Sequence, residues 1–145
     1  MIRIMASIFI AAAGILMLSQ CRNQHSKSEI ESGMLRYDNL IQKMNADSIA
    51  LMYSPDGDLG EMAHGRDSIR KFLSTFKNVE VLEQSSVSDS IQLHGDSAVQ
   101  YGGYRQVAVI DKKDTASLKG TYIANWIWVP GEGWRIKKMT TKPAN

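Results

Sequence analysis

Residues 125–139, NWIWVPGEGWRIKKM, contain two apolar segments separated by Pro130-Gly131-Glu132-Gly133. Proline and glycine together favour a tight turn, and the flanking tryptophan, isoleucine and valine residues favour β-strands. The stretch therefore predicts two antiparallel strands, residues 118–129 and 134–141, joined by a hairpin.

The pattern continues upstream, where residues 79–93 and 97–110 also favour extended structure. His94-Gly95-Asp96 separates these two segments, and residues 111–116 connect the second to residue 118. Both connections contain residues typical of turns. We therefore expect four long antiparallel strands that follow one another along the chain.

Three segments before residue 79 have apolar residues three or four positions apart, the spacing of one face of a helix. They cover residues 30–44, 47–53 and 66–76, with Asp47 as the expected cap of the second. The first has apolar positions at Ile30, Met34, Tyr37, Ile41 and Met44. Pro55-Asp56-Gly57 predicts a turn before a short strand at residues 59–63. Helices followed by a strand meander predict an α+β domain, three N-terminal helices packed on a curved antiparallel sheet.

The N-terminus has one charge, Arg3, and then an apolar run from Ile4 to Leu18. A run of this length is typical of a secretory signal rather than of a membrane span. Leu18-Ser19-Gln20-Cys21 resembles the lipobox of bacterial lipoproteins, although Gln20 stands where a small residue is usual. The resemblance implies a signal peptide at residues 1–20, lipidation of Cys21, and export to the bacterial cell envelope, on the periplasmic face or the cell surface. An ordinary signal peptide or an uncleaved anchor remains the alternative.

Residues 21–29 are polar and without periodicity, so we expect a tether there and a single domain at residues 30–145. His25 in this tether is expected to be solvated and incidental. His64 and His94 lie in turns without the spacing of metal ligands, and the sequence has no phosphate-binding or dinucleotide-binding motif. With a net charge of +2 in 145 residues, no strongly basic surface is expected either. We therefore expect no metal, no cofactor and no nucleic-acid partner.

From residue 34 to residue 139 the chain resembles the nuclear transport factor 2-like superfamily, which includes ketosteroid isomerase and SnoaL-like cyclases. The resemblance rests on RYDNLIQKMNADSIALMY (36–53), HGRDSIRKFL (64–73), GDSAVQYGGY (95–104) and the stretch quoted first. It implies a cone-shaped fold with a cavity between helices and sheet. The superfamily contains enzymes, binding proteins and assembly domains, so the fold leaves the function open.

In ketosteroid isomerase a tyrosine and a protonated acid stabilise an oxyanion, and a carboxylate acts as base. The resemblance places Tyr37 on the tyrosine, Glu61 on the base and Asn125 on the second donor, which is an amide here. The alternative is structural: Tyr37 belongs to the core, and Glu61 is either solvated or forms an ion pair with Lys138. A lysine that close would weaken the carboxylate as a base.

Alternation along the last two strands gives the expected orientation of their side chains. If Trp134 faces the helices, Lys138 faces them too, and an inward Asn125 implies an inward Ile127. Together with Tyr53, these residues would line the pocket: Tyr53, Ile127, Trp134 and Lys138. The same alternation turns the aromatic residues Tyr122, Trp126 and Trp128 outward, where they would form the interface of a homodimer. A register shifted by one residue would instead bring the tryptophans into the pocket.

These observations favour a membrane-anchored envelope lipoprotein whose cavity binds a small apolar molecule without catalysis. One alternative is an isomerase-like or cyclase-like enzyme that uses Tyr37 and Glu61 in general acid–base catalysis. The other is a dimeric protein-interaction module that acts through the tryptophan surface.

Overall fold

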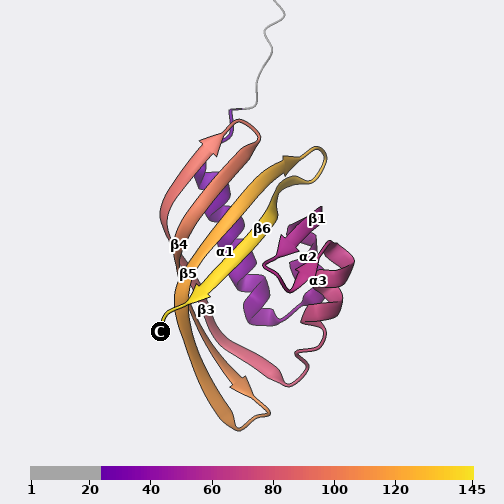
Figure 1. Ribbon diagram of the computed structural model, residues 1–145, viewed down its shortest axis with the longest axis vertical. Helices are drawn as coiled ribbons and strands as arrows, with labels where there is room; N and C mark the ends of the chain where they lie inside the picture. Colours follow the sequence, from indigo (N-terminus) through magenta and orange to yellow (C-terminus); the bar gives the residue numbers. More distant parts are fainter. Residues whose placement is uncertain (1–23) are drawn as a thin grey trace, which may run out of the picture.

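The structure is a computed structural model that describes residues 24–145 (Figure 1). The predicted signal peptide and the predicted lipidation site, Cys21, lie outside the described residues. Among the helices of residues 24–145, none has the length and apolar character needed to cross a membrane.

Three helices and one six-stranded sheet make up the described chain. The helices are α1 (Lys27–Lys43), α2 (Ala46–Leu51) and α3 (Arg66–Leu73). The strands are β1 (Tyr53–Leu59), β2 (Ala63–His64), β3 (Val79–His94), β4 (Ser97–Ile110), β5 (Asp114–Val129) and β6 (Gly133–Pro143). Their order in the sheet is β2-β1-β6-β5-β4-β3. Neighbouring strands are antiparallel except β1 and β6, which are parallel. The predicted α+β class and the four long strands are therefore confirmed.

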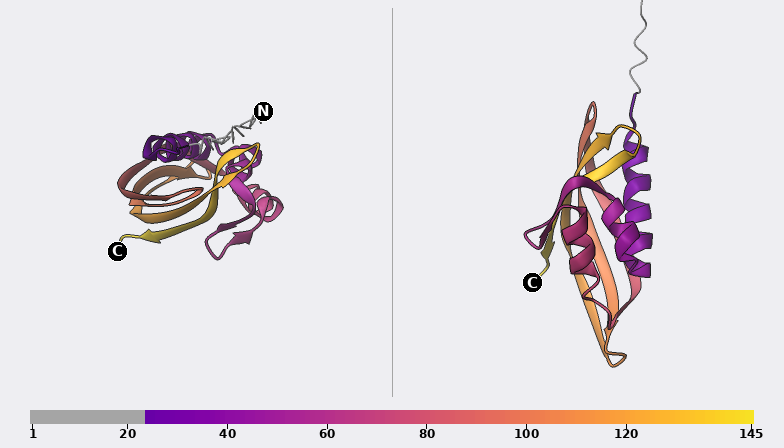
Figure 2. Two further views of the ribbon diagram at one scale, coloured as in Figure 1. Left: turned by 90° about the horizontal axis from the view of Figure 1, so that it is seen from above. Right: turned by 90° about the vertical axis from the view of Figure 1, so that its right-hand side faces the viewer.

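The long strands β3 to β6 form a curved sheet, and α1 lies across its concave side (Figure 2). The short elements α2, α3, β1 and β2 gather beside one end of α1 (Figure 1). The space over the concave face of the sheet therefore lies between α1 and α3.

Helix α1 begins earlier than the sequence predicts. The Glu29 Oε2 atom accepts a hydrogen bond from the backbone N–H of Ser26 at 2.6 Å, which satisfies a free donor at the start of the helix. Residues 27–29, predicted as tether, are therefore the first turn of α1. At the other end, Met44 adopts a left-handed conformation with φ of 48° and ends the helix.

The side chain of His25 is not solvated, contrary to the prediction. Its ring lies against two tryptophans, with centroids 4.3 Å from Trp128 and 4.9 Å from Trp134. Its Nε2 atom lies 3.3 Å from Oδ1 of Asp96, in the β3–β4 turn. The His25 side chain is therefore held against the strand ends, whereas its neighbours Gln24 and Ser26 are exposed.

The segment between α2 and α3 also differs from the prediction. Asn45, rather than Asp47, caps α2, since its Oδ1 accepts a hydrogen bond from the Ser48 N–H at 3.0 Å. Pro55-Asp56-Gly57 is not a turn but lies within β1, at an irregularity in its pairing with β6. The strand predicted at residues 59–63 is instead mostly the turn that joins β1 to β2.

The predicted orientation of Lys138 is wrong because β6 contains a β-bulge. Asn125 pairs with Lys138, but the next residue, Trp126, pairs with Ile136, so Lys137 is the extra residue. As predicted, Trp134 faces inward with Ile136 and is buried. Beyond the bulge the alternation is reset, Met139 is buried, and Lys138 lies on the opposite side.

The predicted orientation of β5 is also reversed. Tyr122 and Trp126 are buried, with 3% and 1% of their surface exposed, whereas Ile127 is exposed. Trp126 fills the space below α1, and its Nε1 donates a hydrogen bond to Gln100 Oε1 at 3.1 Å. Ile127 therefore does not face the helices. The alternation is shifted by one residue, as in the alternative, but Trp126 enters the core and is not part of the described cavity lining.

This reversal removes the aromatic surface on which the homodimer was predicted. Tyr122 and Trp126 face the core, and Trp128 is partly buried against it. The homodimer stays a prediction, but its interface does not include the rings of Tyr122 and Trp126.

Adjacent glycines in β4 provide a test of this packing. A Cβ atom on Gly102 would overlap the Val87 carbonyl oxygen and lie 2.7 Å from Tyr122 Cε1, whereas one on Gly103 would have no neighbour closer than 3.5 Å. We expect Gly102→Ala to lower the free energy of unfolding by about 3 kcal/mol and Gly103→Ala to change it by less than about 1 kcal/mol. Urea denaturation of the domain measures both values. Equal effects of the two substitutions would contradict the close packing of Tyr122 on β4.

Candidate functional site

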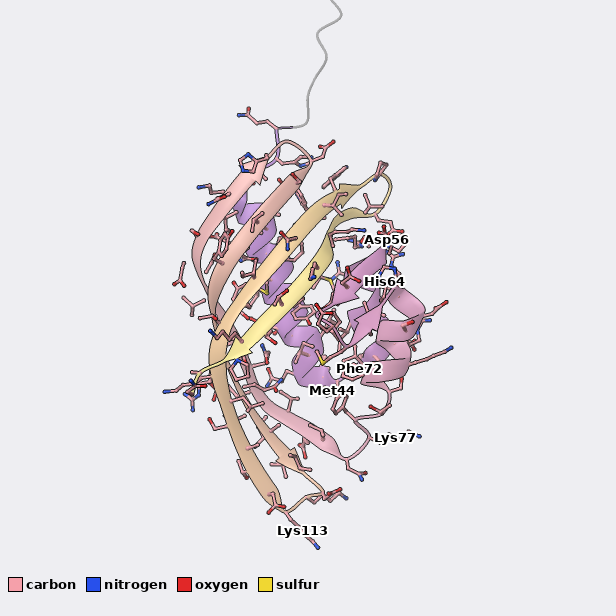
Figure 3. The ribbon with its side chains drawn as sticks, viewed as in Figure 1. Met44, Asp56, His64, Phe72, Lys77 and Lys113 are labelled. Carbon is pink, nitrogen blue, oxygen red and sulfur yellow. The ribbon has the colours of Figure 1, made fainter. Side chains whose placement is uncertain are left out.

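A cavity of ≈ 480 Å³ lies between the helices and the concave face of the sheet. Its outer part is lined by apolar side chains from both layers, including Ile41, Met44, Phe72, Leu73, Phe76 and Leu118. Met44 and Phe72 lie where the end of α1 approaches α3 (Figure 3). None of the described lining residues carries a charge. The size and lining are typical of a site for a small, mostly apolar molecule.

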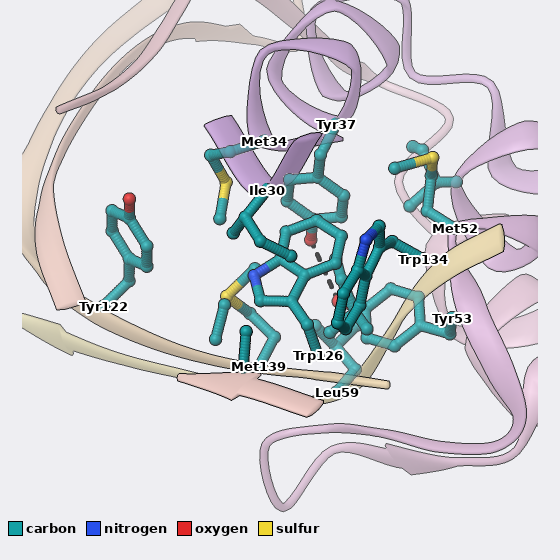
Figure 4. Close-up of a cluster of buried hydrophobic side chains, with 14 of the residues drawn as sticks. Ile30, Met34, Tyr37, Met52, Tyr53, Leu59, Tyr122, Trp126, Trp134 and Met139 are labelled. Atoms are coloured by element: carbon teal, nitrogen blue, oxygen red, sulfur yellow. Dashed lines mark hydrogen bonds between the residues drawn. The ribbon is translucent and has the colours of Figure 1, made fainter. Parts of the chain in front are cut away.

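The inner part of the cavity contains the predicted site residue Tyr37. Its hydroxyl lies 3.0 Å from the hydroxyl of Tyr53 (Figure 4). Tyr53 was also predicted to line the pocket, but it is fully buried behind Tyr37 and is not one of the described lining residues. Burial raises the pKa of Tyr37 from its ordinary value of 10.0 to about 12, and the hydrogen bond with Tyr53 only partly offsets this effect. Tyr37 is therefore a neutral hydrogen-bonding group at physiological pH.

The structure does not place Glu61 at the cavity. Glu61 is exposed in the turn between β1 and β2 and is not one of the described lining residues. Among the described residues, no ion pair joins it to Lys138 either. The position of Glu61 therefore agrees with a solvated residue, and neither with the catalytic interpretation nor with the predicted ion pair to Lys138.

The remaining predicted residues are also away from the cavity lining. Asn125 lies on the outer side of β5, between the inward-facing Ala124 and Trp126. Trp134 is buried at the other end of the sheet, where its ring centroid lies 5.8 Å from that of Trp128. The structure thus does not bring Tyr37, Glu61 and Asn125 together.

A polar cluster that the sequence interpretation missed borders the cavity instead. Asp38 on α1 is 5% exposed, and its Oδ1 accepts hydrogen bonds from Gln84 Nε2 at 3.0 Å and Ser86 Oγ at 2.8 Å. Gln106 on β4 extends the cluster, because its Nε2 donates to Gln84 Oε1 at 3.0 Å. Gln84, Ser86 and Gln106 belong to the cavity lining, with Asp38 behind them.

The sequence did contain a signal for this cluster. Asp38 lies four residues after Met34 and three before Ile41, so it occupies the apolar face of α1. A carboxylate on such a face needs hydrogen-bond donors opposite it. Gln84 and Ser86, two residues apart on β3, supply them.

Tyr122 belongs both to the buried core and to the cavity lining. Its ring packs on Gly102 and also forms part of the cavity wall (Figure 4). Burial raises the pKa of Tyr122 to about 12, and the nearby Asp38 carboxylate adds to the increase. The inner cavity is therefore a surface of neutral hydroxyl and amide groups backed by one carboxylate.

No protein-family model and no curated protein sequence matches the chain. Solved structures do resemble it. A nuclear transport factor 2-like superfamily protein from Salmonella enterica serovar Typhimurium LT2 has a TM-score of 0.67 at 21% identity, covering 81% of this chain and 90% of that one. A ketosteroid isomerase-like protein from Erwinia carotovora atroseptica has a TM-score of 0.70 at 15% identity, covering 81% and 95%.

A third similar structure is a nuclear transport factor 2-like protein with a cystatin-like fold from Novosphingobium aromaticivorans. Its TM-score is 0.66 at 15% identity, with 81% of each chain covered. Likeness at these identities shows the fold, and the predicted nuclear transport factor 2-like fold is confirmed.

The raised pKa of Tyr37 predicts a loss of stability at high pH. The folded state holds this proton more tightly than the unfolded state, so the stabilisation is complete below pH 10 and decreases between pH 10 and about 12. In that range Tyr37 contributes a decrease in the free energy of unfolding of about 1.4 kcal/mol per pH unit. Denaturation at pH 9 to 12 should therefore show a shallower decrease for Tyr37→Phe than for the wild type. Equal slopes would contradict the buried, protonated Tyr37.

Proposed function

We propose that the protein binds a small, mostly apolar molecule in this cavity and does not catalyse a reaction there. The observation that carries the proposal is the ≈ 480 Å³ cavity, whose described lining is uncharged and mainly apolar. Burial of apolar ligand surface contributes roughly 25 cal/mol per Å² before the costs of association. Such a surface can bind a small molecule without any charged contact.

The position of the acidic residues supports binding rather than general acid–base catalysis. A catalytic base must come within hydrogen-bond distance of the proton that it removes. Glu61 is exposed outside the lining, and Asp38 lies behind Gln84 and Ser86. Tyr37, with a pKa of about 12, is protonated at neutral pH and is suited to donating a hydrogen bond rather than to removing a proton.

The binding proposal can be tested by filling the cavity from β5. Ala116 lines the cavity, whereas Ile127 on the same strand is exposed and is not part of the lining. We expect Ala116→Trp to weaken binding of 2-methylnaphthalene, an uncharged apolar probe, about tenfold or more, which corresponds to ~1.4 kcal/mol. Ile127→Trp should leave the affinity unchanged. Fluorescence titration measures both.

Thermal unfolding of the two variants checks that each is folded. A wild-type protein that does not bind the probe, or equal losses in both folded variants, would contradict ligand binding in this cavity.

We further propose that the domain is attached to a membrane of the cell envelope through lipid on Cys21. The support is the sequence: the one cysteine of the chain directly follows an apolar export signal. Acyl chains stabilise membrane attachment by about 0.8 kcal/mol for each buried methylene group, so several chains hold a small domain firmly.

Substitution of the cysteine tests the anchor. In a bacterial host, Cys21→Ala should abolish incorporation of labelled palmitate and remove the mature protein from the membrane fraction. Ser19→Ala retains the sulfur atom and should still be labelled. If Cys21→Ala is labelled and fractionates as the wild type does, the proposed lipidation is wrong.

A further inference from the structure

Three side chains, those of Asp38, Gln84 and Gln106, form a hydrogen-bonded chain that leads from the buried carboxylate to the cavity. Asp38 Oδ1 accepts from Gln84 Nε2 at 3.0 Å, and Gln84 Oε1 accepts from Gln106 Nε2 at 3.0 Å. Helix α1 supplies the first residue, β3 the second and β4 the third. Gln84 and Gln106 face the cavity.

The carboxylate sets the direction of this chain. An ionised carboxylate can only accept hydrogen bonds, so Gln84 must turn its NH₂ group toward Asp38 and its carbonyl oxygen toward Gln106. Gln106 then has to donate with its own NH₂ group. The Oε1 atom of Gln106 accepts no hydrogen bond from the described residues. Gln106 is therefore held with a free acceptor at the cavity wall.

The charge of Asp38 also affects which ligands the cavity can bind. The carboxylate of Asp38 lies just behind the lining, and no described lining residue is cationic. A ligand anion would meet a like charge in a poorly solvated space and would lose its own hydration without a cationic partner among the described lining residues. A neutral molecule does not incur this cost.

We infer that the cavity prefers a neutral, mostly apolar molecule that carries a hydroxyl or N–H donor for Gln106, and that it disfavours carboxylate anions. This inference rests on the proposed binding function and specifies the class of ligand. The apolar outer lining accommodates the body of the molecule, and the Gln106 acceptor orients its polar end.

Three probes of similar size separate these effects: 2-naphthol has a hydroxyl donor, 2-methylnaphthalene has no polar group, and 2-naphthoate is an anion at neutral pH. We expect Gln106→Met, which removes the acceptor but keeps an apolar side chain of similar length, to weaken 2-naphthol binding about three- to tenfold. Its affinity for 2-methylnaphthalene should change less than twofold. The control is Gln92→Met on β3, where the exposed glutamine is not part of the cavity lining.

Asp38→Asn tests the charge separately. Asparagine retains an oxygen that can accept from Gln84 and Ser86, so the variant removes the charge with little change in shape. We expect the affinity for 2-naphthoate, relative to 2-methylnaphthalene, to rise about threefold or more. Isothermal titration at pH 7 and thermal unfolding of each variant provide the affinities and the check on folding.

The outcomes distinguish the inference from the proposed function. If the wild type binds none of the three probes, the binding function is wrong and the inference falls with it. If the wild type binds 2-methylnaphthalene but Gln106→Met weakens 2-naphthol no more than it weakens 2-methylnaphthalene, the binding function stands and the donor preference is wrong. An unchanged 2-naphthoate ratio in folded Asp38→Asn would overturn the exclusion of anions.

Discussion

The contact between Trp126 and α1 is the constraint on which the rest of the fold depends. A Cβ atom on Gly33 would lie 3.0 Å from Trp126 Cη2, so the helix crosses the sheet directly over the indole ring. The ring is 1% exposed, and Gln100 satisfies its N–H group. Because a fully buried indole makes many close contacts, it fixes the distance between the two layers. That distance keeps the inner cavity open beside it, where Met34, Tyr122 and Met139 line the space.

The four long strands could be predicted from the sequence because turn residues mark their ends. Ser97–Ile110 was predicted with the boundaries that the structure has, and the other three agree within a few residues. The side that each residue faces was harder to predict, since a bulge reverses the alternation without leaving a clear sequence signal. Lys137 is such a residue, and neither glycine nor proline marks it. On β5, the positions that face the core were assigned from a resemblance around Asn125, and the assignment was wrong by one residue.

The candidate site was predicted only in part for the same reason. Tyr37 lines the cavity because helical spacing alone places it on the inner face of α1. Glu61 was assigned through a turn predicted at residues 55–57, which the structure shows to be part of β1, and it lies in solvent. The polar cluster around Asp38 depends on residues 46 and 48 positions apart in the sequence. Such a pairing follows from tertiary structure, and local patterns in a single sequence do not specify it.

The docking of His25 against Trp128 and Trp134 determines how the domain would be held at a membrane. It fixes the start of α1 at one end of the molecule, whereas Ile41, Met44 and Phe76 line the cavity near the other end of that helix. The 17 residues of α1 span about 25 Å at 1.5 Å per residue. If the chain is anchored through Cys21 as proposed, the anchor would lie on the side of His25, and the apolar end of the cavity would lie at the opposite end of α1. A bound molecule would then exchange with the aqueous space or with another protein, and not directly with the lipid to which the domain is attached.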